Sequence, residues 1–150
     1  MTPLHPDHSR PHLLVAEDEP GVATLIEECL TDEGYRVTLA GDGVEAVEAL
    51  PRADYDLLLT DVRMPRLDGV GLVRHVRTAR PAMPIVVLSG YMTPDARTEL
   101  HRLGVPNERV LEKPLPFPEL HDAIRRALRA AAQEIAARRA TGGEHGPAKE

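Results

Sequence analysis

Acidic, hydroxyl and amine side chains in this sequence directly follow short apolar runs. Clustered carboxylates supply the oxygen ligands that hard divalent cations prefer. A carboxylate beside such a cation can also act as a nucleophile toward phosphorus, giving an acyl phosphate. A lysine would pair with one phosphoryl oxygen as a point charge, and a hydroxyl could hydrogen-bond another. The residues that could carry this chemistry are Glu17, Asp18, Asp61, Ser89 and Lys113.

The apolar runs that precede these residues are expected to be buried strands. Continuous apolar runs of this length suit strands that are covered on both faces. Between them, apolar residues recur at helical spacing, and Gly34 and Gly104 follow two of the predicted helices, as C-terminal glycines commonly do. We expect strands at 13–16, 35–40, 56–61, 84–89 and 109–112, and helices at 20–33, 43–50, 70–80, 94–103 and from 117 onward.

Five strands that alternate with five helices predict an α/β fold. The right-handed connections between such units give a doubly wound parallel sheet with helices on both faces. In open sheets of this kind, sites form at the carboxyl ends of the strands. The three acids, the hydroxyl and the amine are therefore expected to converge on one rim of the sheet.

Composition narrows the class of protein. The formal charge of the 150 residues is −6, which argues against a nucleic-acid-binding surface. Cys29 is the single cysteine, so an intramolecular disulfide is impossible. The sequence has no secretory signal pattern and no apolar run long enough to cross a bilayer, so we expect a cytoplasmic protein with neither nucleic acid nor membrane as partner. We expect a flexible leader over 1–12, one domain with an extended C-terminal helix over 13–139, and a disordered tail over 140–150.

Four segments carry a family resemblance. They are LVAEDEP at 14–20, DLLLTDVRMP at 56–65 followed by Asp68 and Gly69, VVLSGY at 86–91, and LEKP at 111–114. In this order, each at the end of a predicted strand, they resemble the motifs of response-regulator receivers in two-component systems. The resemblance covers about residues 13–128 and implies a flavodoxin-like sheet with strand order 2-1-3-4-5.

The resemblance also implies a role for each residue. Asp61 would be the phosphoacceptor, Ser89 the hydroxyl switch, and Lys113 the phosphoryl-binding lysine. Gly69 would open the third helix, and the Lys113–Pro114 peptide bond would be cis. Mg²⁺ (or Mn²⁺) would be held by Glu17, Asp18, Asp61 and the backbone carbonyl of Arg63.

The leading functional hypothesis is a stand-alone receiver. It would take a phosphoryl group from a histidine kinase or a histidine phosphotransfer protein and signal to a downstream target by protein–protein contacts. Its only chemistry would be its own phosphorylation and autodephosphorylation, so it would not be an enzyme with a separate substrate. It could form a homodimer through the face of the fourth helix, fifth strand and fifth helix, or through the C-terminal helix.

One departure from the family pattern keeps an alternative open. Receivers often carry an aromatic switch residue three positions before the lysine, where this sequence has Val110. Tyr91 is a candidate substitute, and Arg63 and Tyr91 together would shield the phosphoryl group and slow autodephosphorylation.

Two alternative functions stay open. One is a phosphate-independent interaction module of the same fold, and the other is a small phosphatase on the same scaffold.

Overall fold

The structure is a computed structural model that describes residues 10–114 and 117–148, with side chains described as far as residue 140. The strands are β1 (His12–Ala16), β2 (Arg36–Ala40), β3 (Leu57–Asp61), β4 (Ile85–Ser89) and β5 (Val110–Glu112). The α-helices are α1 (Pro20–Asp32), α2 (Gly43–Ala49), α3 (Gly69–Ala79), α4 (Pro94–Arg102) and α5 (Phe117–Ala148), and two short 3₁₀ turns cover Leu50–Arg52 and Asn107–Arg109.

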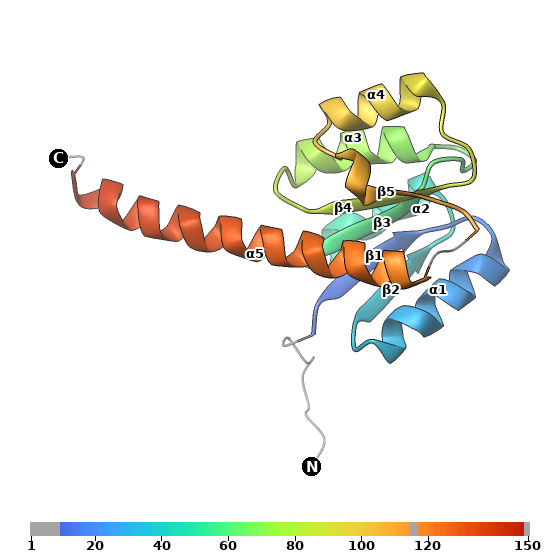
Figure 1. Cartoon of the computed structure of the whole chain (residues 1–150), viewed down its shortest axis with the longest axis horizontal. Helices are drawn as coiled ribbons and strands as arrows, with labels where there is room; N and C mark the ends of the chain where they lie inside the picture. The colour runs from blue at the N-terminus through green and yellow to red at the C-terminus, as the bar shows by residue number, and fades with distance from the viewer. Residues whose placement is uncertain (1–9, 115–116, 149–150) are drawn as a thin grey trace, which may run out of the picture.

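The five strands form one parallel sheet. Their order is β2-β1-β3-β4-β5, which confirms both the predicted α/β fold and the strand order. Helices α1 and α5 cover one face, and α2, α3 and α4 cover the other (Figure 1). Since all strands point the same way, their carboxyl ends lie along one rim.

Each face of the sheet has its own aliphatic core. The alternation of side chains along a strand sends neighbouring residues to opposite faces. Thus Leu13 and Val15 of β1 pack with α1 and α5, whereas Leu14 and Ala16 pack with the helices of the other face. Every residue of β3 and β4 is buried, as expected for central strands covered on both sides.

Short polar side chains begin three of the helices. Asp42, Asp68 and Thr93 each accept a hydrogen bond from a backbone N–H three residues later, at the starts of α2, α3 and α4. Such N-caps satisfy donors that the helix itself leaves unpaired. Gly34 and Gly104 have φ values of 97° and 86°, a left-handed conformation that glycine adopts without a Cβ penalty. The three caps set where loops along the rim end, and the two glycines begin loops at the opposite edge of the sheet.

Helix α5 is longer than the sequence predicts. We expected a disordered tail from residue 140, but the helix continues to Ala148, since each further residue in an established helix adds one hydrogen bond. Figure 1 shows α5 projecting well beyond the sheet. Residues 1–9 of the predicted leader and 149–150 of the predicted tail lie outside the described residues. Within the described part, no helix combines the length and apolar character that crossing a membrane requires.

Candidate functional site

The rim at the carboxyl ends of the strands brings together all the side chains that the sequence nominates. Glu17 and Asp18 follow β1, and Asp61 is the last residue of β3. Ser89 ends β4, and Lys113 directly follows β5. Glu17, Asp61 and Ser89 are buried, whereas Asp18 is exposed. The site is therefore reached from solvent on the Asp18 side.

Three carboxylates form the acidic part of the site. One oxygen from each of Glu17, Asp18 and Asp61 lies within 4.8 Å of the other two. Three hard oxygen ligands at this separation suit a divalent cation such as Mg²⁺, which usually keeps several waters besides one or two carboxylates. The set therefore fits the predicted metal, with the exposed Asp18 leaving room for water.

Lys113 joins the two buried carboxylates. Its ammonium Nζ donates to Asp61 Oδ2 at 2.8 Å and to Glu17 Oε1 at 3.1 Å. The backbone N–H of Lys113 donates to the carbonyl of Ser89 at 2.8 Å, which fixes the start of the β5 loop against β4. The Lys113–Pro114 peptide bond is cis, as predicted.

Burial and their mutual contact shift the pKa values of Glu17 and Lys113. Burial raises the pKa of Glu17, and the hydrogen bond from Lys113 only partly opposes this effect. Burial alone would lower the pKa of the Lys113 ammonium, but the hydrogen bonds to Asp61 and Glu17 outweigh it and raise that pKa above its ordinary value. Lys113 therefore stays positively charged between the two carboxylates at neutral pH.

The two oxygens of Asp61 have different partners. Oδ1 accepts from the backbone N–H of Val62 at 2.7 Å and, more weakly, from that of Arg63 at 3.4 Å. Oδ2 faces Lys113. The carboxylate is thus held in one orientation by the first residues of the loop after β3, and this arrangement is the pre-organisation that a positioned nucleophile requires.

A glycine lets α3 begin directly beneath this loop. Gly69 opens α3, as predicted, and its N–H donates to the carbonyl of Val62 at 2.7 Å. A second close approach occurs at Gly43, where an added Cβ would lie 2.1 Å from the carbonyl oxygen of Leu67. The loop that follows Asp61 is therefore tightly packed against the starts of α2 and α3.

Ser89 is engaged with its own loop. Its hydroxyl donates to the carbonyl of Tyr91 at 2.8 Å and accepts from the N–H of Tyr91 at 3.1 Å. Ser89 is fully buried, whereas Tyr91 is 62% exposed. Val110, at the position where many receivers have an aromatic residue, is buried in the core shared with α3 and α4.

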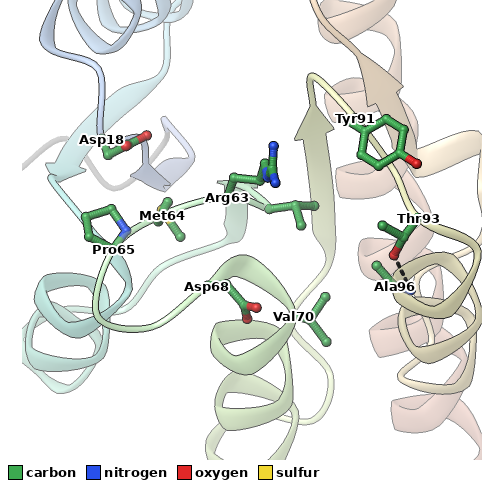
Figure 2. Close-up of a pocket in the computed structure, with 10 residues that line it drawn as sticks. Asp18, Arg63, Met64, Pro65, Asp68, Val70, Tyr91, Thr93 and Ala96 are labelled. Atoms are coloured by element: carbon green, nitrogen blue, oxygen red, sulfur yellow. Dashed lines mark hydrogen bonds between the residues drawn. The ribbon is translucent and has the colours of Figure 1, made fainter.

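A cleft of about 640 Å³ opens beside the acidic cluster. Figure 2 shows Asp18 at one end, Arg63 in the middle, and Tyr91 and Thr93 at the other end. Asp61 is not among the lining residues, but Val62, which follows it in the chain, and Asp18, which shares the acidic cluster with it, both line the cleft. The cleft therefore gives an incoming group an approach to the rim that passes Arg63 and Tyr91.

The sequence did not predict the ion pair between Asp42, at the start of α2, and Arg66, in the loop after β3. Asp42 caps α2 and also accepts from Arg66, at 2.8 Å from Nε and 3.2 Å from Nη2. The bonds from Arg66 and from the Glu45 backbone lower the pKa of Asp42. Arg66 has a φ of 68°, so the bend after β3 places a non-glycine residue in the left-handed region. No sequence spacing pairs residues 42 and 66, although Asp42 before a helix is a visible cap signal.

Comparisons with known proteins agree with this architecture. The sequence profile described as "Response regulator receiver domain" matches residues 13–125. The transcriptional regulatory protein GlrR of Escherichia coli is 36% identical over 122 residues, which are 81% of this chain and 27% of that protein. CusR of the same organism, also named a transcriptional regulatory protein, is 34% identical over 123 residues, 82% of this chain and 53% of that protein.

Among solved structures, the chemotaxis protein CheY4 of Vibrio cholerae superposes with a TM-score of 0.73. It is 28% identical, and the match covers 79% of this chain and 98% of that one. The chain spans about a quarter of the length of relatives such as GlrR and about half that of CusR. The match therefore concerns the receiver portion of those longer proteins.

Proposed function

The chain belongs to the response regulator receiver domain family, and on that premise we propose that Asp61 accepts a phosphoryl group from a phosphohistidine. The observation that carries the proposal is the arrangement of Asp61, which lies 2.8 Å from the Lys113 ammonium and within 4.8 Å of carboxylate oxygens of Glu17 and Asp18. A buried carboxylate held between a cation and further acids suits a nucleophile that works with a metal.

The acids would hold Mg²⁺ or Mn²⁺. Glu17, Asp18 and Asp61 would supply carboxylate oxygens, and the backbone carbonyl of Arg63 would be the fourth protein ligand. When bound, the cation neutralises charge that develops on the transferring phosphoryl group. Two groups of the chain would position the reactants. The N–H of Val62 orients Asp61, and Lys113 would offer its positive charge to a phosphoryl oxygen.

The transfer step balances without any other reactant. A carboxylate oxygen of Asp61 would form a bond to phosphorus while the bond from phosphorus to the donor's imidazole nitrogen breaks. When the other ring nitrogen of the phosphohistidine carries a proton, the electron pair of that bond returns to the ring, which leaves as a neutral imidazole. Lys113 and the backbone donors would then stabilise the dianionic phosphoryl group on Asp61.

Ser89 would couple the phosphoryl group to the rest of the domain. Its hydroxyl now bonds to the backbone of Tyr91. To bond to a phosphoryl oxygen, it would have to give up this donor bond, which frees the loop between β4 and α4. Such an exchange is a local event that can shift a two-state equilibrium of the loop.

The partners proposed are a histidine kinase or histidine phosphotransfer protein as donor, and a downstream protein as target. A groove of about 350 Å³ beside β5 and α5 is lined by side chains of both charges, including Arg109, Glu119 and Arg126. A mixed-charge groove of this kind suits a protein partner. The expectations of a stand-alone domain and of a homodimer stay predictions, because the matched transcriptional regulators are longer proteins.

Autodephosphorylation is proposed to be slow. Arg63 and Tyr91 line the cleft that leads to the rim, so they stand on the route that water would take to the acyl phosphate. We propose no further catalytic activity, since the site accounts for phosphoryl acceptance and its hydrolysis. The half-life of the phosphorylated chain tests this point, and a half-life of seconds would contradict it.

The primary test is intact-mass spectrometry after incubation with a small acyl-phosphate donor and Mg²⁺. The expected result is a single phosphoryl adduct on the wild type that requires Mg²⁺ and is absent from Asp61→Asn. Asp54→Asn is the matched control, because Asp54 is exposed and lies before β3, away from the rim.

Two outcomes would count against the proposal. An adduct that persists in Asp61→Asn would place the phosphoacceptor elsewhere. Absence of an adduct with every donor, including a phosphorylated histidine phosphotransfer protein, would favour the phosphate-independent interaction module. In the latter case, Mg²⁺ binding to the unmodified protein would also be expected to be absent.

A further inference from the structure

The loop between β3 and α3 contains a strained turn at Arg66. Arg66 has a φ of 68°, in the left-handed region that a residue with a Cβ rarely adopts. The N–H of Leu67 donates to the carbonyl of Pro65 at 2.8 Å, so Arg66 is the central residue of a three-residue turn. A turn of this kind with a positive φ at its centre is rare and strained. Other contacts must therefore hold Arg66 in this conformation.

The side chain of Arg66 supplies such a contact by bonding to Asp42 at the start of α2. Its Nε donates to Asp42 Oδ2 at 2.8 Å, and its Nη2 donates to Asp42 Oδ1 at 3.2 Å. The same carboxylate caps α2 by accepting from the N–H of Glu45 at 2.8 Å. Ion pairs between exposed side chains contribute little, but the Asp42 side chain is only 12% exposed. A forked arginine contact to such a carboxylate has a fixed geometry.

The loop that contains Arg66 also carries the backbone groups nearest to Asp61. The N–H groups of Val62 and Arg63 donate to Asp61 Oδ1 at 2.7 and 3.4 Å, and the Arg63 carbonyl is the backbone ligand proposed for Mg²⁺. The loop is closed at its base, where the Gly69 N–H donates to the Val62 carbonyl at 2.7 Å. Arg66 lies in the middle of this closed loop, so its ion pair ties the loop to α2 at a second point.

We propose that Arg66 is a positioning residue for phosphoryl acceptance. Its ion pair with Asp42 offsets the cost of the left-handed turn and thereby keeps the loop after β3 in the shape that serves Asp61 and its cation. The role is indirect, because Arg66 is not among the residues that line the cleft beside the acidic cluster. The inference rests on the proposed function, since it concerns the same site.

Charge and position make opposite predictions for Mg²⁺ binding. By Coulomb's law alone, removing a positive charge near an acidic site strengthens cation binding. Loss of positioning weakens it, because the backbone groups around Asp61 would move away from their places. Weaker Mg²⁺ binding after removal of the Arg66 charge therefore reports on position and not on electrostatics.

The first test is hydrogen exchange of the full chain without Mg²⁺. In Arg66→Ala, the amides of Val62 and Gly69 should exchange about fivefold faster than in the wild type, the scale for weakening one hydrogen bond. Arg66→Gly loses the same charge and the same ion pair, but glycine adopts the left-handed conformation without a Cβ penalty. Exchange in Arg66→Gly should therefore lie closer to that of the wild type.

The second test is Mg²⁺ affinity by isothermal titration calorimetry. Arg66→Ala should bind about tenfold more weakly, the lower end of the range for losing a residue that orients metal ligands, and Arg66→Gly should recover most of the affinity. Asp42→Asn can still cap α2, and it should weaken binding less in Arg66→Ala than in the wild type, because the pair acts as a unit. Arg77→Ala is the control: it removes the same charge together with bonds to the Leu103 and Met83 carbonyls, so it should lower stability without changing Mg²⁺ affinity.

Several outcomes would overturn the inference. They are unchanged exchange at Val62 and Gly69 in Arg66→Ala, Mg²⁺ binding in Arg66→Ala as tight as in the wild type or tighter, and equal effects of alanine and glycine at position 66. A wild type that binds no Mg²⁺ would instead refute the proposed function, while the metal-free exchange experiment would still decide whether Arg66 holds the loop. Circular dichroism of each variant separates a local change from loss of the fold.

Discussion

Gly69 and Asp61 approach so closely that no side chain fits between them: a Cβ on Gly69 would lie 2.1 Å from the carbonyl oxygen of Asp61. The backbone around the proposed phosphoacceptor therefore leaves no room for a side chain at position 69. Because the neighbouring atoms are backbone, the contact cannot be relieved by turning a flexible side chain.

Gly69→Ala is expected to destabilise the fold by about 2 to 3 kcal/mol, the scale of overpacking a dense site. It should also slow phosphorylation, since the displaced backbone carries Asp61. Urea unfolding measures the change in the free energy of unfolding. Gly21→Ala is the control: no atom lies within 4 Å of a Cβ at that helical glycine, so alanine should be neutral or stabilise by up to about 1 kcal/mol. Equal effects of both changes would refute the packing argument.

Lys113→Met is expected to strengthen Mg²⁺ binding while it slows phosphorylation. The lysine charge lies within hydrogen-bond distance of the same carboxylates that would hold the metal, so removing it relieves a competing cation. Coulombic attraction at this range suggests about a tenfold fall in the dissociation constant. Isothermal titration calorimetry measures the Mg²⁺ dissociation constant and suits this chain, which has no tryptophan to report binding by fluorescence. Lys113→Arg keeps the charge and should leave Mg²⁺ affinity closer to wild type. Weaker Mg²⁺ binding in Lys113→Met would show that the charges do not compete.

Arg77→Ala is expected to cost about 2 to 4 kcal/mol of stability. The guanidinium donates to the carbonyls of Leu103 at 2.6 Å and Met83 at 2.5 Å, and more weakly to Pro81 and Gly104. It thereby ties the loop before β4 to the loop after α4, and its loss leaves carbonyls without donors. Arg74→Ala, on the same helix, removes only an exposed ion pair with Glu99 and should cost under about 1 kcal/mol. Thermal unfolding of the pair tests the difference, and similar losses would contradict it.

Ser89→Ala is expected to loosen the loop between β4 and α4. The change removes both hydrogen bonds to the backbone of Tyr91, a loss of about 1 kcal/mol. Hydrogen exchange of the Tyr91 amide should then accelerate about fivefold, with little change in the strands. An unaltered exchange rate at Tyr91 would mean that other contacts hold the loop.

His12 is expected to make stability depend on pH. Its ring packs against that of Tyr55 in a tilted arrangement, with the ring centroids 4.6 Å apart, and its Nε2 lies 2.7 Å from the hydroxyl of Thr38. Burial first, and then Arg36, lower the pKa of His12 below its ordinary value of about 6.5. The unfolded chain therefore binds a proton more readily than the folded one, so stability is full above pH 6.5 and falls as pH drops toward the lowered pKa. Melting temperatures between pH 7.5 and 5 should show this slope, and His12→Gln should flatten it. A slope that survives the substitution would assign the effect to other groups.

The sequence predicted which residues meet at the rim because these residues lie at strand ends, and the strands are visible as apolar runs. Asp61, Ser89 and Lys113 each follow such a run, and parallel strands must bring these ends together. The start of α3 at Gly69 and the cis bond before Pro114 followed from the family resemblance, and both are confirmed.

Contacts between polar residues far apart in the sequence were not predictable. The Asp42–Arg66 pair depends on a left-handed residue after β3, and the bonds of Arg77 depend on where two loops end. Neither feature has a periodic sequence signal. The extent of α5 was not predicted either. The polar composition after residue 140 suggested that the helix ends there, whereas α5 continues to Ala148.

The length of α5 has a mechanical consequence. Leu128 is the last α5 residue in the hydrophobic core of its face, and the helix from there to Ala148 is roughly 30 Å long. A rigid rod of that reach magnifies small rotations at its base. A tilt of about 10° where α5 meets the sheet would sweep the far end through about 5 Å, so a small rotation of the helix would be readable at a distance.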